Sequence, residues 1–239
     1  MRKHLSVLAL WYRCSFKWEA LCMVVMSVAE LVLFARALGK ADPAVSVALE
    51  ELLAGSLIPQ VCMLGFTYVV CGLYSMSGAN TLARLSIREE TAALWQTVYN
   101  ACCLLLFWAV QAVLILIMCL WYARWMDSAY VSGQTAVLAA YRIPFFHRFL
   151  PVADWLIWLS NLLLVTELAF SPACAGLRLR RGSRSSLCFL GMGLMMLTAG
   201  LGAAELMELE HLLLFAAILC LCVDGAYFVE RWRGKPDEE

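Results

Sequence analysis

The sequence predicts an all-α polytopic membrane protein with six transmembrane helices. Of its 239 residues, 63% are hydrophobic and only 15% are charged. Several apolar runs approach the roughly 20 residues that a helix needs to cross a hydrocarbon core about 30 Å thick. The Lys and Arg residues gather in alternate segments between these runs, as expected for a chain that crosses a bilayer repeatedly. We therefore expect one transmembrane domain over residues 18–239, preceded by a short helix over residues 1–17.

The helix predicted over residues 1–17 is amphipathic and interfacial. Its basic residues fall in one sector of a helical wheel, while apolar and aromatic residues fill most of the remainder. This pattern is typical of a helix that lies in the membrane interface. A cleaved signal peptide is not expected, because the preceding polar region is too long and Glu30 interrupts the apolar run.

The six spans are predicted over residues 18–38, 52–74, 91–121, 153–171, 186–204 and 209–229. The third is long enough to tilt or to project beyond the bilayer. Between the third and fourth spans, the segment that contains Pro144 and Pro151 is rich in aromatic and basic residues. It is predicted to be an interfacial or re-entrant element.

The distribution of basic residues predicts that both termini are cytoplasmic and that the protein lies in the plasma membrane. With the N-terminus inside, the cytoplasmic segments hold 13 of the 18 Lys and Arg residues. These are Arg2, Lys3, Arg13, Lys17, Arg84, Arg88, Arg178, Arg180, Arg181, Arg184, Arg231, Arg233 and Lys235. The outer segments hold the other five, Arg36, Lys40, Arg124, Arg142 and Arg148. This asymmetry follows the positive-inside rule.

A polar bridge over residues 75–90 separates the second and third spans. Asn80 or Thr81 can cap a short turn over residues 82–85, and Ser86 with Glu89 forms a capping box that begins the next helix. Arg84 and Arg88 favour a cytoplasmic position. We expect a short cytoplasmic helix here, with an ordinary intracellular loop as the alternative.

Polar residues inside the spans fall on defined helix faces. Gln96, Asn100 and Gln111 share a narrow sector of the third span, and Glu30 shares a face of the first span with Glu19. An ionisable group in hydrocarbon is costly, so these residues should face the bundle interior. They would line a substrate path or hydrogen-bond neighbouring helices.

Two further acids, Glu167 and Asp224, are placed near the cytoplasmic ends of the fourth and sixth spans. The densest group of basic residues, Arg178 to Arg184, follows the fourth span. We expect both acids to pair with this group.

No motif in the sequence predicts an enzyme, a nucleotide site or a cofactor. The patterns HExxH, GxSxG, GxGxxG and the Walker A motif are missing from it. Glu205, Glu208 and His211 share one helix face, but an acidic outer turn explains them better than a metal site. The 11 Cys residues lack metal-site spacing and are expected to pack as small apolar groups. A net charge of zero gives no general attraction to nucleic acid.

The order of elements resembles the permease subunit of type-2 ATP-binding-cassette exporters. The likeness lies in the amphipathic helix, two spans, the short cytoplasmic segment Thr81-Leu82-Ala83-Arg84-Leu85-Ser86-Ile87, and the spans that follow. It implies a coupling helix that docks on a separate ATPase subunit, and a second permease half in a homodimer or heterodimer. The docking residues would be Thr81, Leu82, Arg84, Leu85 and Ile87.

The chain also departs from that family's pattern. The family has re-entrant helices or an outer domain between spans five and six, where this chain has only a short acidic turn. The proline-bounded element falls between spans three and four instead. The alternative function is therefore a structural, sensory or accessory membrane protein that does not itself transport.

Overall fold

The computed structural model describes residues 2–40, 49, 52, 53, 65, 87–126, 132–141, 155–180 and 207–233. All of its secondary structure in this part of the chain is α-helical. Several predicted elements lie largely or wholly outside the described residues: the spans over 52–74 and 186–204, the segment over 142–151, and the docking residues Thr81, Leu82, Arg84 and Leu85.

The first helix, α1, runs without a break over Arg2–Lys40. The helix thus shows no break at residue 17, where a boundary between an interfacial helix and a span was predicted, and its segment long and apolar enough to cross a membrane begins at Ser15. No Gly or Pro occurs between residues 2 and 38, so nothing in the local sequence ends the helix. One buried stripe, with members mostly four residues apart, also crosses the expected boundary. Its members are Val7, Trp11, Ser15, Glu19, Cys22, Met26, Glu30, Phe34 and Leu38.

Helix α5 covers Glu89–Met126 and begins two residues before the predicted span. Glu89 and Glu90 occupy its first turn, where acidic side chains favour the positive end of the helix dipole. The first-turn amide of Ala92 donates to the carbonyl of Arg88 at 3.0 Å. With 38 residues, the helix is about 57 Å long at 1.5 Å per residue, well beyond the thickness of a hydrocarbon core.

A short helix, α6, covers Gly133–Tyr141 and packs against α5 near Met126. Ser132 and Thr135 cap its start reciprocally. The amide of Thr135 donates to the Ser132 hydroxyl at 3.2 Å, and the amide of Ser132 donates to the Thr135 hydroxyl at 2.8 Å. A Cβ at Gly133 would lie 3.1 Å from the Leu120 side chain, so glycine allows the close approach.

Helix α8 covers Trp155–Arg180 and α10 covers Met207–Arg233. The fourth span was predicted to end at residue 171, whereas α8 continues through Pro172 for more than two further turns and its membrane-length segment ends at Leu179. Proline lacks the amide that would bond the preceding turn, yet the helix persists because residues 171–177 are all buried. Asn100 and the aromatic rings of α10 pack beside this part of α8.

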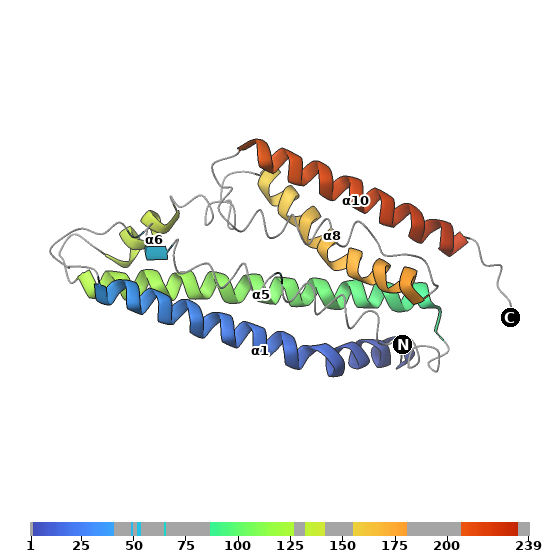
Figure 1. Ribbon diagram of the computed structural model, residues 1–239, viewed down its shortest axis with the longest axis horizontal. Coiled ribbons are helices and arrows are strands. Elements are labelled where there is room, and N and C mark those ends of the chain that lie inside the picture. The colour runs from blue at the N-terminus through green and yellow to red at the C-terminus, as the bar shows by residue number, and fades with distance from the viewer. Residues whose placement is uncertain are drawn as a thin grey trace.

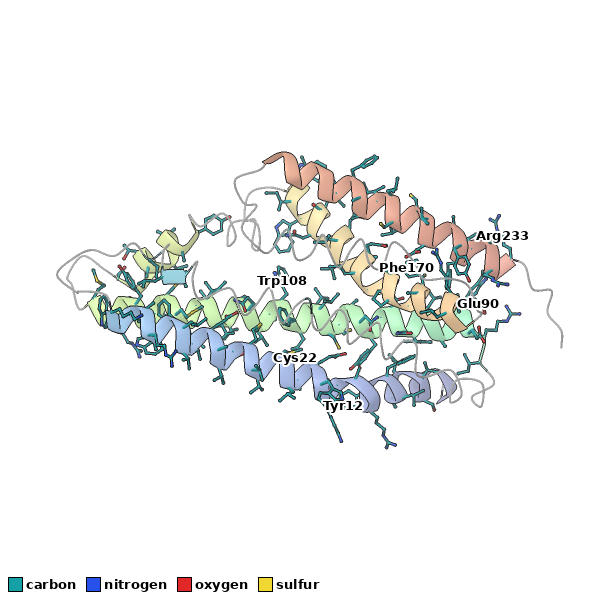
Figure 2. All side chains as sticks on the ribbon, viewed as in Figure 1. Tyr12, Cys22, Glu90, Trp108, Phe170 and Arg233 are labelled. Carbon is teal, nitrogen blue, oxygen red and sulfur yellow. The ribbon has the colours of Figure 1, made fainter. Side chains whose placement is uncertain are left out.

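The long helices form a bundle around α5, which contacts α1, α6, α8 and α10. Figure 1 shows that α1 and α5 begin at the same end of the bundle, where α8 and α10 finish. Thus α1 and α5 run in one direction, and α8 and α10 run in the other. Figure 2 shows Glu90 of α5 and Arg233 of α10 together at that end. We call it the basic end, because Arg88, Arg178, Arg231 and Arg233 gather there.

The long helices expose many apolar side chains along their length, while several polar side chains are buried in the mainly apolar interior. Large apolar residues are exposed on every long helix, for example Val28 at 56%, Val113 at 55%, Leu162 at 64% and Phe215 at 68%. A monomeric soluble protein rarely exposes so continuous an apolar surface. Three helical segments, Ser15–Lys40, Glu89–Met126 and Trp155–Leu179, are long and apolar enough to cross a membrane. By helix length and hydropathy, the chain is a candidate multi-pass helical membrane protein.

Candidate functional site

The polar residues that the sequence placed on span interiors are all buried. The exposed fraction is 0% for Glu30 and Gln111, 1% for Gln96 and 3% for Asn100. Six more polar residues are buried in the described part of the chain: Ser15, Glu19, Glu90, Glu167, Ser171 and Asp224. The candidate site is therefore a set of polar contacts along the helix interfaces.

One contact joins α1 to α5 within an otherwise apolar cluster. Gln111 donates through Nε2 to Oε2 of Glu30 at 3.0 Å. The other carboxylate oxygen of Glu30 and the amide oxygen of Gln111 have no hydrogen-bond partner among the described residues. Met26, Phe34 and other large apolar side chains surround this pair. This hydrogen bond links two candidate spans directly.

A second contact joins the same helices nearer the basic end, and the sequence did not predict it. The Tyr99 hydroxyl donates to Oε2 of Glu19 at 3.1 Å. The Ser15 hydroxyl has one proton, which it donates either to the Tyr99 oxygen at 2.9 Å or to the carbonyl of Trp11 at 3.1 Å. Tyr99 falls on the same side of α5 as Gln96, three residues before it, and this spacing was the available signal.

Asn100 contacts a different neighbour, although it shares a predicted sector with Gln111. Its side-chain amide donates to the backbone carbonyl of Ala169 in α8 at 3.1 Å. Close by, Trp108 of α5 packs edge to face against Trp158 of α8, with ring centroids 5.7 Å apart. The stripe thus divides between two interfaces: Gln111 binds α1 and Asn100 binds α8. Gln96 is also buried, and its amide oxygen has no hydrogen-bond partner within the described ranges.

An ion pair joins α8 to α10. Nη2 of Arg178 lies 2.7 Å from Oδ1 of Asp224, and the guanidinium lies 4.5 Å from the ring centroid of Tyr227. The side chain of Asp224 is 0% exposed and that of Arg178 is 14% exposed. The predicted pairing of Asp224 with the basic group therefore holds for Arg178.

Glu167 was expected to pair in the same way, but it makes no hydrogen bond with Arg178, and the other side chains of the basic group lie outside the described residues. Because α8 continues to Arg180, Glu167 lies in the middle of the helix and not near its cytoplasmic end. Neither of its carboxylate oxygens has a hydrogen-bond partner among the residues described. Glu167 was expected near the cytoplasmic end because the fourth span was predicted to end at residue 171.

Of the predicted docking residues, only Ile87 is described. It packs, partly buried, against a cluster of α1 and α5 side chains that includes Val7, Trp11 and Tyr99. Its apolar side chain therefore contacts this protein's own helices, while the next residue, Arg88, is exposed. Arg88 also lines a shallow hollow with Glu90, Arg231 and Trp232, where the start of α5 meets the end of α10.

The described residues include no group of three or more His, Cys, Asp or Glu side chains that could hold a metal ion. Seven cysteines whose side chains are described, among them Cys103 beside Glu19 and Tyr99, form no disulfide bond. Comparison with known proteins gives no match to the chain among protein-family models, curated proteins or solved structures. The chemistry of the described site is hydrogen bonding and ion pairing between helices in an apolar environment.

Proposed function

We propose that this chain is the membrane-spanning permease subunit of an ATP-binding-cassette transporter, with six spans, both termini cytoplasmic, and a separate ATPase subunit as its partner. A second permease half, identical or related, would complete the transporter in the plasma membrane. The proposal rests chiefly on one relation, the common end of the bundle at which Ile87, Arg88 and the start of α5 lie beside the basic ends of α8 and α10.

The helix directions support six spans. Because α1 and α5 run in the same direction, an odd number of crossings between them fits a membrane topology, and residues 52–74 would supply one. The same reasoning applies to α8 and α10, between which residues 186–204 would cross. The total is six, with both termini on one side.

The charges support the orientation and the place of docking. Arg88, Arg231 and Arg233 are exposed at the basic end, which would face the cytoplasm under the positive-inside rule. Ile87, which belongs to the bridge, lies there and contacts α1 and α5. A partner bound to residues 81–85 would thus act on a segment attached directly to two spans.

One observation favours a second candidate function, that of a non-transporting structural or accessory membrane protein. In the Gln111–Glu30 and Asn100–Ala169 hydrogen bonds, polar residues of α5 bind neighbouring helices. Their side-chain amides therefore have hydrogen-bond partners without any substrate. Such contacts are expected of a scaffold as much as of a permease. The two candidates differ in whether the bridge binds an ATPase.

The decisive experiment is co-purification of the full-length protein with a candidate ATPase that carries Walker A and B motifs. Under the proposal, Arg84→Glu and Leu85→Asp each reduce recovery of the ATPase at least tenfold, because a short docking surface concentrates affinity in few residues. Arg36→Glu, the same charge reversal at the opposite end of α1, serves as the matched control and leaves recovery unchanged.

Protein in the membrane fraction is measured in parallel and is expected to be equal for all three variants, since residues 84 and 85 lie outside every predicted span and Arg36 is exposed. If both bridge variants retain the ATPase at the wild-type level, the bridge is an ordinary loop. The accessory function then becomes the better explanation.

A further inference from the structure

Four buried oxygen atoms between α8 and α10 have no hydrogen-bond partner in the described structure. They are both carboxylate oxygens of Glu167, the hydroxyl oxygen of Ser171, and Oδ2 of Asp224. Asp224 is close enough to Glu167 for their charges to interact, and the Ser171 hydroxyl lies next to Asp224. All three side chains are 0% exposed. Three oxygen-bearing residues thus meet in one place, and with both acids ionised the single hydroxyl proton of Ser171 is the only donor among them.

The position of this oxygen cluster in the candidate span is central. Twelve residues of the segment Trp155–Leu179 precede Glu167 and twelve follow it. Ser171 is one helical turn closer to the basic end, and Arg178 is two further turns along the same face. The cluster therefore reaches from mid-span toward the basic end.

The charges in the cluster do not balance. Arg178 neutralises Asp224 through the 2.7 Å contact and stacks on Tyr227, and no described contact joins it to Glu167. On α5, which packs against both helices, the nearest assigned polar group is Asn100, whose amide binds the Ala169 carbonyl. The charged residues of α5 on this side, Arg88 and Glu90, lie at its first turn beside Arg231. Among the described residues, one negative charge is left without a counter-charge in an apolar surrounding, which is expensive.

We propose that Glu167, Ser171 and Oδ2 of Asp224 form an intramembrane site for one small cation, either Na⁺ or H⁺. Either cation supplies the missing positive charge. Na⁺ would bind several of the four oxygens at once, whereas H⁺ would bond to one carboxylate oxygen and be shared with a neighbouring oxygen. Arg178 orients Asp224 through its other oxygen. Carboxylate and hydroxyl oxygens are hard ligands suited to Na⁺ and not to soft transition metals. This site is separate from the bridge and does not depend on ATPase binding.

Labelling with dicyclohexylcarbodiimide tests the proposal on the purified full-length protein. This apolar reagent adds to protonated carboxyl groups in apolar surroundings, and peptide mass spectrometry gives the fraction modified at each acid. We expect Glu167 to be labelled many-fold more than Glu230, an exposed acid of α10 that serves as the internal control. Protection by NaCl, compared with choline chloride at equal ionic strength, identifies Na⁺. Labelling that ignores Na⁺ and rises as the pH falls identifies H⁺.

A second measurement compares variants of the protein with the wild type and does not use the labelling reagent. Thermal unfolding of the wild type is followed in NaCl or choline chloride across a pH series. The unfolding temperature should depend on Na⁺ or on pH, and this dependence should shrink in Glu167→Gln and, should that variant fail to fold, in Ser171→Ala. Glu230→Gln is the matched control and should behave as the wild type.

The proposal is overturned if Glu167 is unlabelled at every pH and salt, or if the cation dependence of unfolding is the same in Glu167→Gln, Ser171→Ala and wild type. Either result would mean that Glu167 is neutralised by another part of the protein. Loss of the ATPase in the bridge variants would be unaffected, so the two proposals fail independently.

Discussion

Nε2 of Gln111 and Oε2 of Glu30 lie 3.0 Å apart across the interface between α5 and α1, although 81 residues separate them in the chain. Both side chains are 0% exposed. An acid and an amide that would each be costly in lipid therefore satisfy one another inside the bundle. The pair holds the middle of the two helices in one register.

Replacing Gln111 by Leu should destabilise the protein. The variant leaves Glu30 buried without its donor, and we expect a loss of about 1–2 kcal/mol in the free energy of unfolding. Gln134→Leu, on the exposed face of α6, is the matched control and should change this quantity little. Chemical unfolding in mixed micelles measures both. Equal stability of Gln111→Leu and wild type would show that the hydrogen bond is not formed.

Replacing Tyr99 by Phe removes only the hydroxyl that links Ser15 and Glu19. We expect this to cost about 1–3 kcal/mol, since the Glu19 carboxylate loses a donor in a buried position. Tyr12→Phe removes the same atom from a side chain that is 53% exposed, and its stability should match the wild type. Thermal unfolding in detergent compares the two. A similar small change in both variants would contradict the assigned bridge.

Removing the guanidinium of Arg178 should be more damaging than removing both partners of its ion pair. Arg178→Gln strands a buried carboxylate, and we expect a loss of about 3 kcal/mol, near the lower end for breaking a buried pair because Arg178 is 14% exposed. The double variant Arg178→Gln with Asp224→Asn should regain part of this loss. Arg233→Gln, exposed at the end of α10, is the control. Strictly additive losses in the double variant would exclude direct coupling.

The topology is tested by reporter fusions after residues 44, 80, 135, 182, 207 and 239. Reporters that are active only in the cytoplasm should be active at 80, 182 and 239 and inactive at 44, 135 and 207. Activity at 44 or 207, or its loss at 80 or 182, would exclude six spans with both termini inside. The structural reason for the expected pattern is that the starts of α1 and α5 and the ends of α8 and α10 all lie at the basic end.

The helices were predictable where apolar composition determines them, and their ends were not. The third predicted span matches α5 within a few residues, because its long apolar run and acidic first turn are local signals. Helix α1 continues through the boundary expected at residue 17, and α8 continues past the end expected at residue 171. In α1, burial against a neighbouring helix continues through a polar stretch that favours a boundary. In α8, it continues through a proline that favours one.

The interior side of the polar stripe could be predicted from helical periodicity, but the partners could not. A helical wheel groups Asn100 with Gln111 because it describes one helix at a time. The structure separates them, since α5 has α1 on one side and α8 on the other. Tyr99 was missed because an aromatic residue near a span end is ordinarily an interfacial anchor.

The separation of Glu30 and Gln111 in the sequence has a consequence for how the protein is made. At a synthesis rate of roughly 5–20 residues per second, the ribosome adds Gln111 about 4–16 s after Glu30. During that interval, the nascent first helix carries an acid whose amide partner does not yet exist. Its stable integration therefore has to wait for α5, and any pause in translation between the two helices lengthens the time during which quality-control proteases can act on the incomplete chain.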